Sequence, residues 1–83
     1  MTPGIHHLNW HVVPGSSNIK RIAHNMMDLH IEFKKPDGSS NGTWKYVGVS
    51  PQQFEAMKAA PSKGGHFRRH VRGKFSTVRT YLD

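Results

Sequence analysis

The sequence contains no cysteine and only five Asp and Glu residues among its 83. Without cysteine the chain can form neither a disulfide framework nor a thiolate metal site, so packing alone must hold the fold, as suits a reducing cytoplasm. The apolar runs are far shorter than the ~20 residues needed to cross a bilayer, and the N-terminus lacks a charged region followed by an apolar stretch. We therefore expect a cytoplasmic protein with no membrane partner.

Positive charge is abundant instead. Twelve Lys and Arg residues against the five acids give a formal net charge of +7. Such an excess favours polyanionic partners through electrostatic steering and counterion release. Small basic domains also bind acidic proteins, so the charge alone does not identify the partner.

The length supports one domain with one thin core. Residues 1–15 mix Pro, Gly and His without clear periodicity, and we interpret them as a partly ordered N-terminal arm in which residues 11–13 can join a sheet edge. Residues 16–83 form the predicted domain.

Three strands are predicted. The first covers residues 16–25, where Ile19 and Ile22 are out of step with a period of two, which indicates a bulge or a late start. Residues 28–34 alternate cleanly between apolar and polar, as a half-buried strand does. The Pro-Asp-Gly and Asn-Gly signals of residues 35–42 predict a hairpin loop that leads into a third strand over residues 43–49.

Two helices should follow. Ser50, Pro51 and Gln53 have the spacing of a capping box with proline at the first helical position, and Pro61 should end this helix. Ser62 can cap a second helix that runs to about Arg72 and has Gly73 for a left-handed end. The fold class is therefore α+β, a small three-stranded antiparallel sheet followed by two helices packed on one face.

The apolar residues of the second helix set its orientation. Phe67, Val71 and Phe75 fall at i, i+4 and i+8, so they should face the core if the helical pattern continues that far. The arginines of the same segment must then point elsewhere.

Three segments are distinctive together: the strand Trp44-Lys45-Tyr46, the segment Val47-Gly48-Val49-Ser50-Pro51 and the run from Ala60 to Phe67. They resemble the KTSC family, named for a domain found at the C-terminus of some lysyl-tRNA synthetases and also present as short stand-alone proteins, and the resemblance spans residues 16–75. It implies an RNA-binding role, which has been proposed for the family from its synthetase context.

Individual positions match the family pattern to different degrees. The following residues stand at matching positions: Ser16, Ser17, Leu29, Ile31, Phe33, Trp44, Tyr46, Ser62, Gly64, Phe67, Val71, Arg72 and Phe75. His66 replaces the first aromatic residue of a pair, Arg68 replaces an Asn, and the proline at position 51 is shifted by one. These departures bear on ligand specificity more than on the fold.

A basic face is the first candidate binding site. Arg68 and Arg72 are four residues apart on the second helix, Arg69 flanks them, and Lys63 and Lys74 lie near the two ends. Together they can line a ridge that contacts the phosphates of RNA. DNA, which has the same phosphates, is a second possible partner. The alternative is the ordinary solvated face of an amphipathic helix.

The strand aromatics are the second candidate. Trp44 and Tyr46 share one face of their strand, and Lys45, Val47 and Val49 occupy the other. If the helices pack on the valine face, the two aromatics form a stacking platform for unpaired bases. If the helices pack on the aromatic face, Trp44 and Tyr46 belong to the core.

The start of the second helix is the third candidate. Ser62, Gly64 and Gly65 can present free amides to an anion such as a phosphate, although the segment lacks the order of a P-loop. The alternative interpretation of this segment is an ordinary helix cap with a tight loop between the two helices.

Other chemistries have little support. His66 and His70 share one helix face, but the Glu of a zinc-protease motif and a third ligand are missing, so we expect no metal and no other cofactor. No serine has a recognisable base and orienting partner, so we expect no enzymatic activity. The rival to RNA binding is an adaptor or phage-encoded inhibitor that binds an acidic protein surface, with Trp10 as an anchor.

Overall fold

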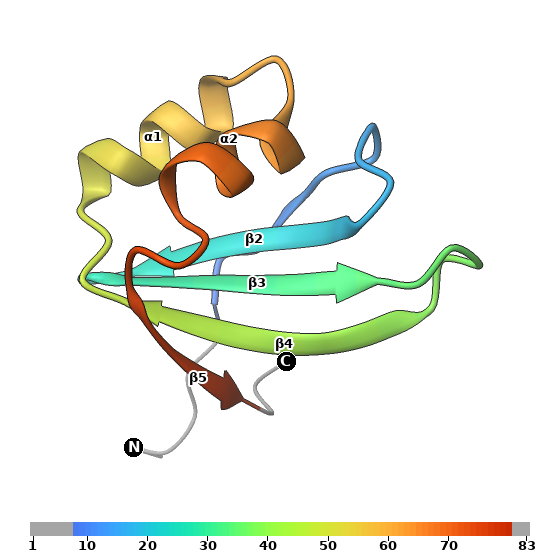
Figure 1. Ribbon diagram of the computed structural model, residues 1–83, viewed down its shortest axis with the longest axis horizontal. Coiled ribbons are helices and arrows are strands. Elements are labelled where there is room, and N and C mark those ends of the chain that lie inside the picture. The colour runs from blue at the N-terminus through green and yellow to red at the C-terminus, as the bar shows by residue number, and fades with distance from the viewer. Residues whose placement is uncertain (1–7, 81–83) are drawn as a thin grey trace.

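The computed structural model describes residues 8–80, which form a five-stranded antiparallel sheet and two helices (Figure 1). The strands follow the chain in the order β1-β2-β3-β4-β5, and each pairs with the next. The elements are β1 (His11–Val12), β2 (Ile19–Asn25), β3 (Asp28–Lys34), β4 (Ser40–Val47), α1 (Pro51–Ala59), α2 (Lys63–His70) and β5 (Ser76–Thr80).

The predicted fold class is confirmed, but the number of strands is wrong. The three predicted strands correspond to β2, β3 and β4, and the sheet gains a further strand at each edge. β1 has two residues, the part of the arm that was expected to join a sheet edge. β5 was not predicted because its residues, Ser-Thr-Val-Arg-Thr, are nearly all exposed and show no apolar alternation.

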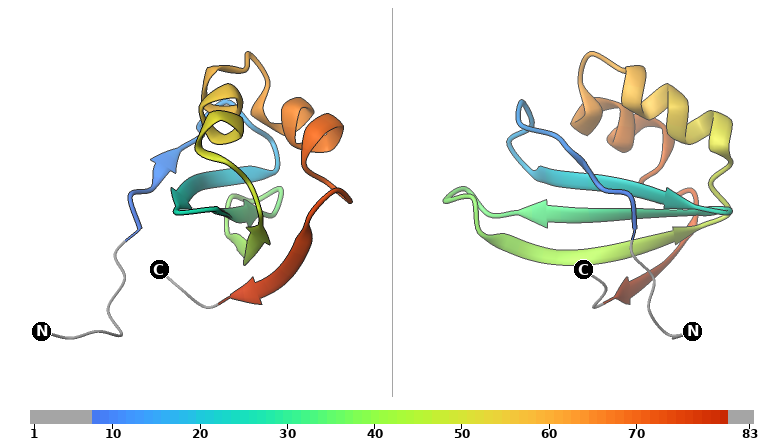
Figure 2. Two further views of the ribbon diagram at one scale, coloured as in Figure 1. Left: turned by 90° about the vertical axis from the view of Figure 1, so that its left-hand side faces the viewer. Right: turned by 180° about the vertical axis from the view of Figure 1, so that it is seen from behind.

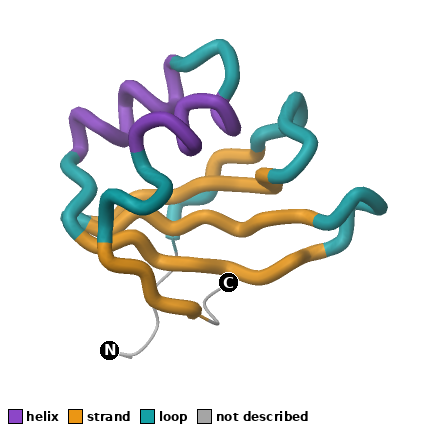
Figure 3. Tube along the Cα trace, in the orientation of Figure 1, coloured by secondary structure: helices purple, strands orange, loops and turns teal. Residues whose placement is uncertain are grey.

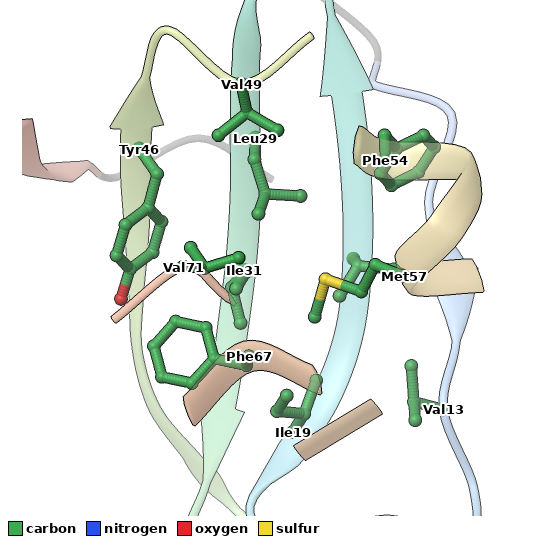
Figure 4. Close-up of a cluster of buried hydrophobic side chains, with 11 residues drawn as sticks. Val13, Ile19, Leu29, Ile31, Tyr46, Val49, Phe54, Met57, Phe67 and Val71 are labelled. Carbon is green, nitrogen blue, oxygen red and sulfur yellow. The ribbon is translucent and has the colours of Figure 1, made fainter. Parts of the chain in front are cut away.

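Both helices lie on the same side of the sheet, and the main core fills the space between the two layers (Figure 2). α1 contributes two buried apolar side chains, and α2 with the residue that follows it contributes two more. β2 and β3 contribute the isoleucines and leucine beneath them (Figure 4). The buried cluster comprises Val13, Ile19, Ile22, Leu29, Ile31, Tyr46, Val49, Phe54, Met57, Phe67 and Val71. Neither helix of residues 8–80 is long and apolar enough to span a bilayer.

β2 has the irregularity that its sequence indicated. The pairing with β3 shifts register between Ile19 and Arg21, and the strand begins at Ile19 and not at residue 16. The shift allows Ile19 and Ile22 to be fully buried together although they are three residues apart. The predicted bulge and late start are therefore both present.

α1 begins with the predicted capping box. The Ser50 hydroxyl accepts a hydrogen bond from the Gln53 amide at 3.1 Å, and the Gln53 side chain accepts one from the Ser50 amide at 2.8 Å. Pro51 occupies the first turn, where its missing N–H is not needed. The helix ends at Ala59, two residues before Pro61.

α2 is shorter than predicted. It ends at His70 and not at Arg72, and Gly73 adopts a left-handed conformation with φ of +74° in the turn that follows. Phe75 therefore does not reach the core as a continuation of the helix. It still packs against the core, because the loop carries the chain from the helix layer down to the sheet edge (Figure 3).

Candidate nucleic-acid interface

The exposed cations of α2 and its following turn form the candidate ridge. Phe67 and Val71 are buried against the sheet, which leaves Arg68, Arg69 and Arg72 exposed on the outer side. Lys74, in the turn after the helix, is also exposed. We use the term basic ridge for these four residues, Arg68, Arg69, Arg72 and Lys74.

The basic ridge lies in a region of the chain without acids. Between Ala56 and Leu82 the sequence has seven Lys and Arg residues and no Asp or Glu. The two ion pairs within residues 8–80 join Arg21 to Glu32 and Lys58 to Glu55, so neither uses a cation of the ridge. The positive charge of α2 is thus not neutralised by a neighbouring carboxylate in the part of the chain that the structure describes.

Lys63 is placed differently from the ridge. Its ammonium donates a hydrogen bond to the carbonyl oxygen of Ala60 at 3.1 Å, just past the C-terminal end of α1. A cation at this position satisfies a carbonyl that the helix leaves without an intrahelical donor. Lys63 therefore ties the two helices together and is only half-exposed.

The two strand aromatics have different environments. Tyr46 is 7% exposed and lies edge-on against Phe67, with ring centroids 5.5 Å apart (Figure 4). Burial raises the pKa of its hydroxyl, and the charge of nearby Arg72 acts in the opposite direction. The helices pack on the aromatic face of β4, so the proposed role of Tyr46 as a base-stacking surface is wrong.

Trp44 remains at the margin of the same face. It is half-buried and packs against the edge of the core. The Arg79 guanidinium, from β5, lies over its ring with Cζ 5.4 Å from the ring centroid. Val49, which the alternation placed on the opposite face, is buried in the core because Gly48, with φ of +98°, redirects the chain after β4.

The predicted anion site is partly used by the protein itself. The Ser62 hydroxyl accepts a hydrogen bond from the Gly65 amide at 3.0 Å, so Gly65 has no free amide to offer. Gly64 is buried, and a Cβ at this position would lie 3.2 Å from the Asn18 side-chain oxygen. Ser62 and Gly64 line a pocket of about 520 Å³, and anion binding there remains a prediction.

This pocket contains residues that the sequence did not bring together. The loop before β2 forms one wall, the turn between the helices forms the other, and Arg68 reaches it from α2. The lining residues are Val12, Val13, Pro14, Gly15, Ser16, Ser17, Asn18, Pro61, Ser62, Lys63, Gly64 and Arg68. Ser16 and Asn18 hydrogen-bond to each other at 3.1 Å and so shape their wall from within.

The paired histidines of α2 lie side by side, with the rings of His66 and His70 4.6 Å apart and tilted by 44°. Burial lowers the pKa of His66, and the neighbouring His70 and Arg69 lower it further. Among residues 8–80 no three His, Asp or Glu side chains gather in a way that could hold a metal ion. His6 and His7 lie outside the described residues.

The site residue that the sequence missed is Arg79. It belongs to β5, which has no apolar alternation, and its relation to Trp44 depends on the pairing of β4 with β5. The only signal in the sequence was the absence of acids around it, which extends the basic region of α2 to the C-terminal strand.

The described residues thus define a small basic α+β domain, in which an antiparallel meander is covered by two helices. The model of the KTSC domain matches residues 15–75, and the chain belongs to the KTSC family. The crystal structure of a KTSC domain protein from Yersinia pestis is similar, with a TM-score of 0.78 and 27% sequence identity over 90% of this chain and 100% of that one. A comparison with curated proteins finds no match.

Proposed function

We propose that this chain is a non-catalytic nucleic-acid-binding module whose partner is RNA, bound through the basic ridge. One observation carries the proposal: the ridge cations are exposed, and they lie within a 56–82 segment that has seven basic residues and no acid. A surface of one sign raises the local concentration of polyanions. The same surface attracts acidic protein surfaces, so an acidic protein is the alternative partner of the ridge.

Arginine suits the binding of phosphates better than lysine does. Its planar guanidinium can donate two parallel hydrogen bonds to one phosphate, and it is less strongly hydrated than an ammonium group. Three of the four ridge residues are arginines. Each phosphate that the ridge neutralises releases counterions, so the affinity should fall steeply with salt.

A second candidate function has its own support. Met26 and Met27 are 82% and 48% exposed in the turn between β2 and β3, and Val47, at the end of neighbouring β4, is 42% exposed. Exposed apolar side chains at one end of a small domain favour a protein partner. Trp10, the earlier candidate anchor, instead lies under the Arg21 guanidinium, 4.1 Å from its Cζ. The basic ridge favours RNA, and a protein partner is the alternative outcome of the test.

Fluorescence anisotropy with a labelled RNA oligonucleotide, over a series of salt concentrations, tests the proposal. The double variant Arg68→Ala with Arg72→Ala should bind at least about tenfold more weakly, and its plot of log affinity against log salt should be shallower by about 1.4, or 0.7 for each lost single-strand phosphate contact. The control, Lys20→Ala with Lys35→Ala, removes the same charge from exposed positions outside the ridge and should change both quantities little.

Equal losses in both double variants would mean that the affinity reflects net charge and not the ridge. A DNA oligonucleotide of the same sequence shows whether the 2′-hydroxyl contributes. Failure of both oligonucleotides to bind at low salt, with recovery of one stoichiometric, nuclease-resistant acidic protein from the host, would replace the RNA proposal with the protein-binding one.

A further inference from the structure

The exposed edge of the sheet brings an aromatic ring and a guanidinium together. Trp44 of β4 lies directly opposite Arg79 of β5, and cross-strand partners point to the same face of a sheet. This face is the one that carries the helices, since Trp44 also lies opposite the buried Ile31. Arg79 is exposed, so the pair lies at the surface, where the cover of the helices ends.

Gly42 makes room for this arrangement. Its Cβ, if it had one, would lie 3.1 Å from Cζ and 3.1 Å from Nη2 of Arg79, closer than side chains normally approach. Its φ of +104° is also a conformation that other residues rarely adopt. The guanidinium therefore lies across the β4 backbone at Gly42 and over Trp44, two residues along the same face.

The pair lies on the same side of the sheet as the helix that carries most of the basic ridge. Tyr46 follows Trp44 on the same face of β4, and its ring packs against Phe67 of α2. The ridge and the pair thus belong to neighbouring parts of one helix-covered face.

We propose that Trp44 and Arg79 form a stacking surface for an unpaired base, and that the RNA bound by this domain is single-stranded. The inference rests on the proposed function and names the class of RNA. Aromatic rings and guanidinium planes both stack with bases, largely independently of sequence. The bases of an A-form duplex are stacked on each other, so a duplex can occupy the ridge but not this surface.

Three probes separate stacking from charge: a single-stranded RNA, its duplex with the complementary strand, and the same single strand with abasic positions. The single strand should bind at least about fivefold more tightly than the other two, since one stacked base is worth about 5- to 150-fold in affinity. Arg79→Lys keeps the charge and loses the plane, so it should weaken the single strand by a similar factor and leave the duplex unchanged.

Fluorescence gives a readout that does not depend on a Trp44 substitution. In a Trp10→Phe variant Trp44 is the one remaining tryptophan of the sequence, and the single strand should quench its emission while the abasic strand does not. Trp44→Leu should also lose the preference for single strands, provided that its circular dichroism matches the parent.

The failure of this inference differs from failure of the proposed function. Equal affinity for single strand, duplex and abasic strand, with Arg79→Lys unchanged, would overturn the stacking surface. If the Arg68→Ala and Arg72→Ala variant still lost binding in that case, the ridge would stand. Absence of binding by every probe at low salt would overturn both.

Discussion

The ring of Tyr46 meets the ring of Phe67 at 79°, with centroids 5.5 Å apart. Phe33 meets the same phenylalanine at 68° and 5.5 Å, so Phe67 is held edge-on by two strands. This contact fixes which side of α2 faces the sheet. The arginines that follow Phe67 are directed outward by the same packing, and the basic ridge depends on it.

Phe67→Ala should therefore destabilise the whole domain. Truncation of a buried phenylalanine costs about 3–5 kcal/mol, a large part of the stability of so small a protein. For a domain of this size each kcal/mol corresponds to about 4–8 °C, so the melting temperature should fall by more than about 12 °C, or the variant should not fold. A thermal melt followed by circular dichroism measures this. A melting temperature within a few degrees of the parent would contradict the packing of α2.

The capping box of α1 gives a second prediction with a smaller effect. Ser50→Ala removes the acceptor for the Gln53 amide and should lower the free energy of unfolding by about 0.5–2 kcal/mol. Gln52→Ala is the matched control, because Gln52 is exposed in the same first turn but lies outside the box. Urea denaturation measures both variants. Equal effects would show that the box adds nothing beyond helix propensity.

The alternation in β4 shows how far sequence reasoning extends. A period of two correctly indicated that Trp44 and Tyr46 share a face. It could not indicate which face the helices cover, because that depends on the packing of α2 through Phe67. The platform and core interpretations therefore had the same sequence pattern, and the contact between Tyr46 and Phe67 decided between them for Tyr46.

The start of α1 could be predicted from the sequence and the edge strand β5 could not, for a related reason. The cap at Ser50 is local, and its signal lies within four residues of sequence. β5 forms because its backbone pairs with β4, residues 43–47 against 76–80, and its exposed side chains are under little constraint to be apolar. The contact between Trp44 and Arg79 depends on that pairing, so no local pattern could have predicted it.

His30 should make stability depend on pH. It is 3% exposed, and its buried Nδ1 has no hydrogen-bond partner. Burial lowers its pKa below the ordinary value of 6.5, Asp28 opposes the shift, and Lys45 and His24 add to it. The unfolded chain therefore takes up a proton at higher pH than the folded one. Stability should be greatest above pH 6.5 and fall as the pH drops through 6.5 toward the folded pKa.

The variant His30→Leu tests this assignment. Urea denaturation from about pH 7 to about pH 5 should give a flatter pH dependence for the variant than for the parent, whatever its stability at neutral pH. An unchanged slope would mean that His30 does not cause the pH dependence. His66 would then be the candidate, because burial lowers its pKa as well.

Gly64 makes a close contact between α2 and the loop before β2. A Cβ at this position would lie 3.2 Å from the Asn18 side-chain oxygen, which also accepts a hydrogen bond from the Ser16 hydroxyl. Alanine is the better helix former by about 1 kcal/mol, so the two effects oppose each other. Because Ser16 holds the Asn18 side chain in place, we expect the steric effect to be larger and Gly64→Ala to be destabilising.

A double-mutant cycle with Asn18→Ala separates the two effects. In the Asn18→Ala background the close contact is gone, so Gly64→Ala should become stabilising by up to about 1 kcal/mol. Urea denaturation of the four proteins should then give a coupling energy of at least about 0.5 kcal/mol, as expected for residues in contact. Additive effects would show that the loop before β2 moves to make room for the new methyl group. The close approach of this loop to α2 would then not require glycine at position 64.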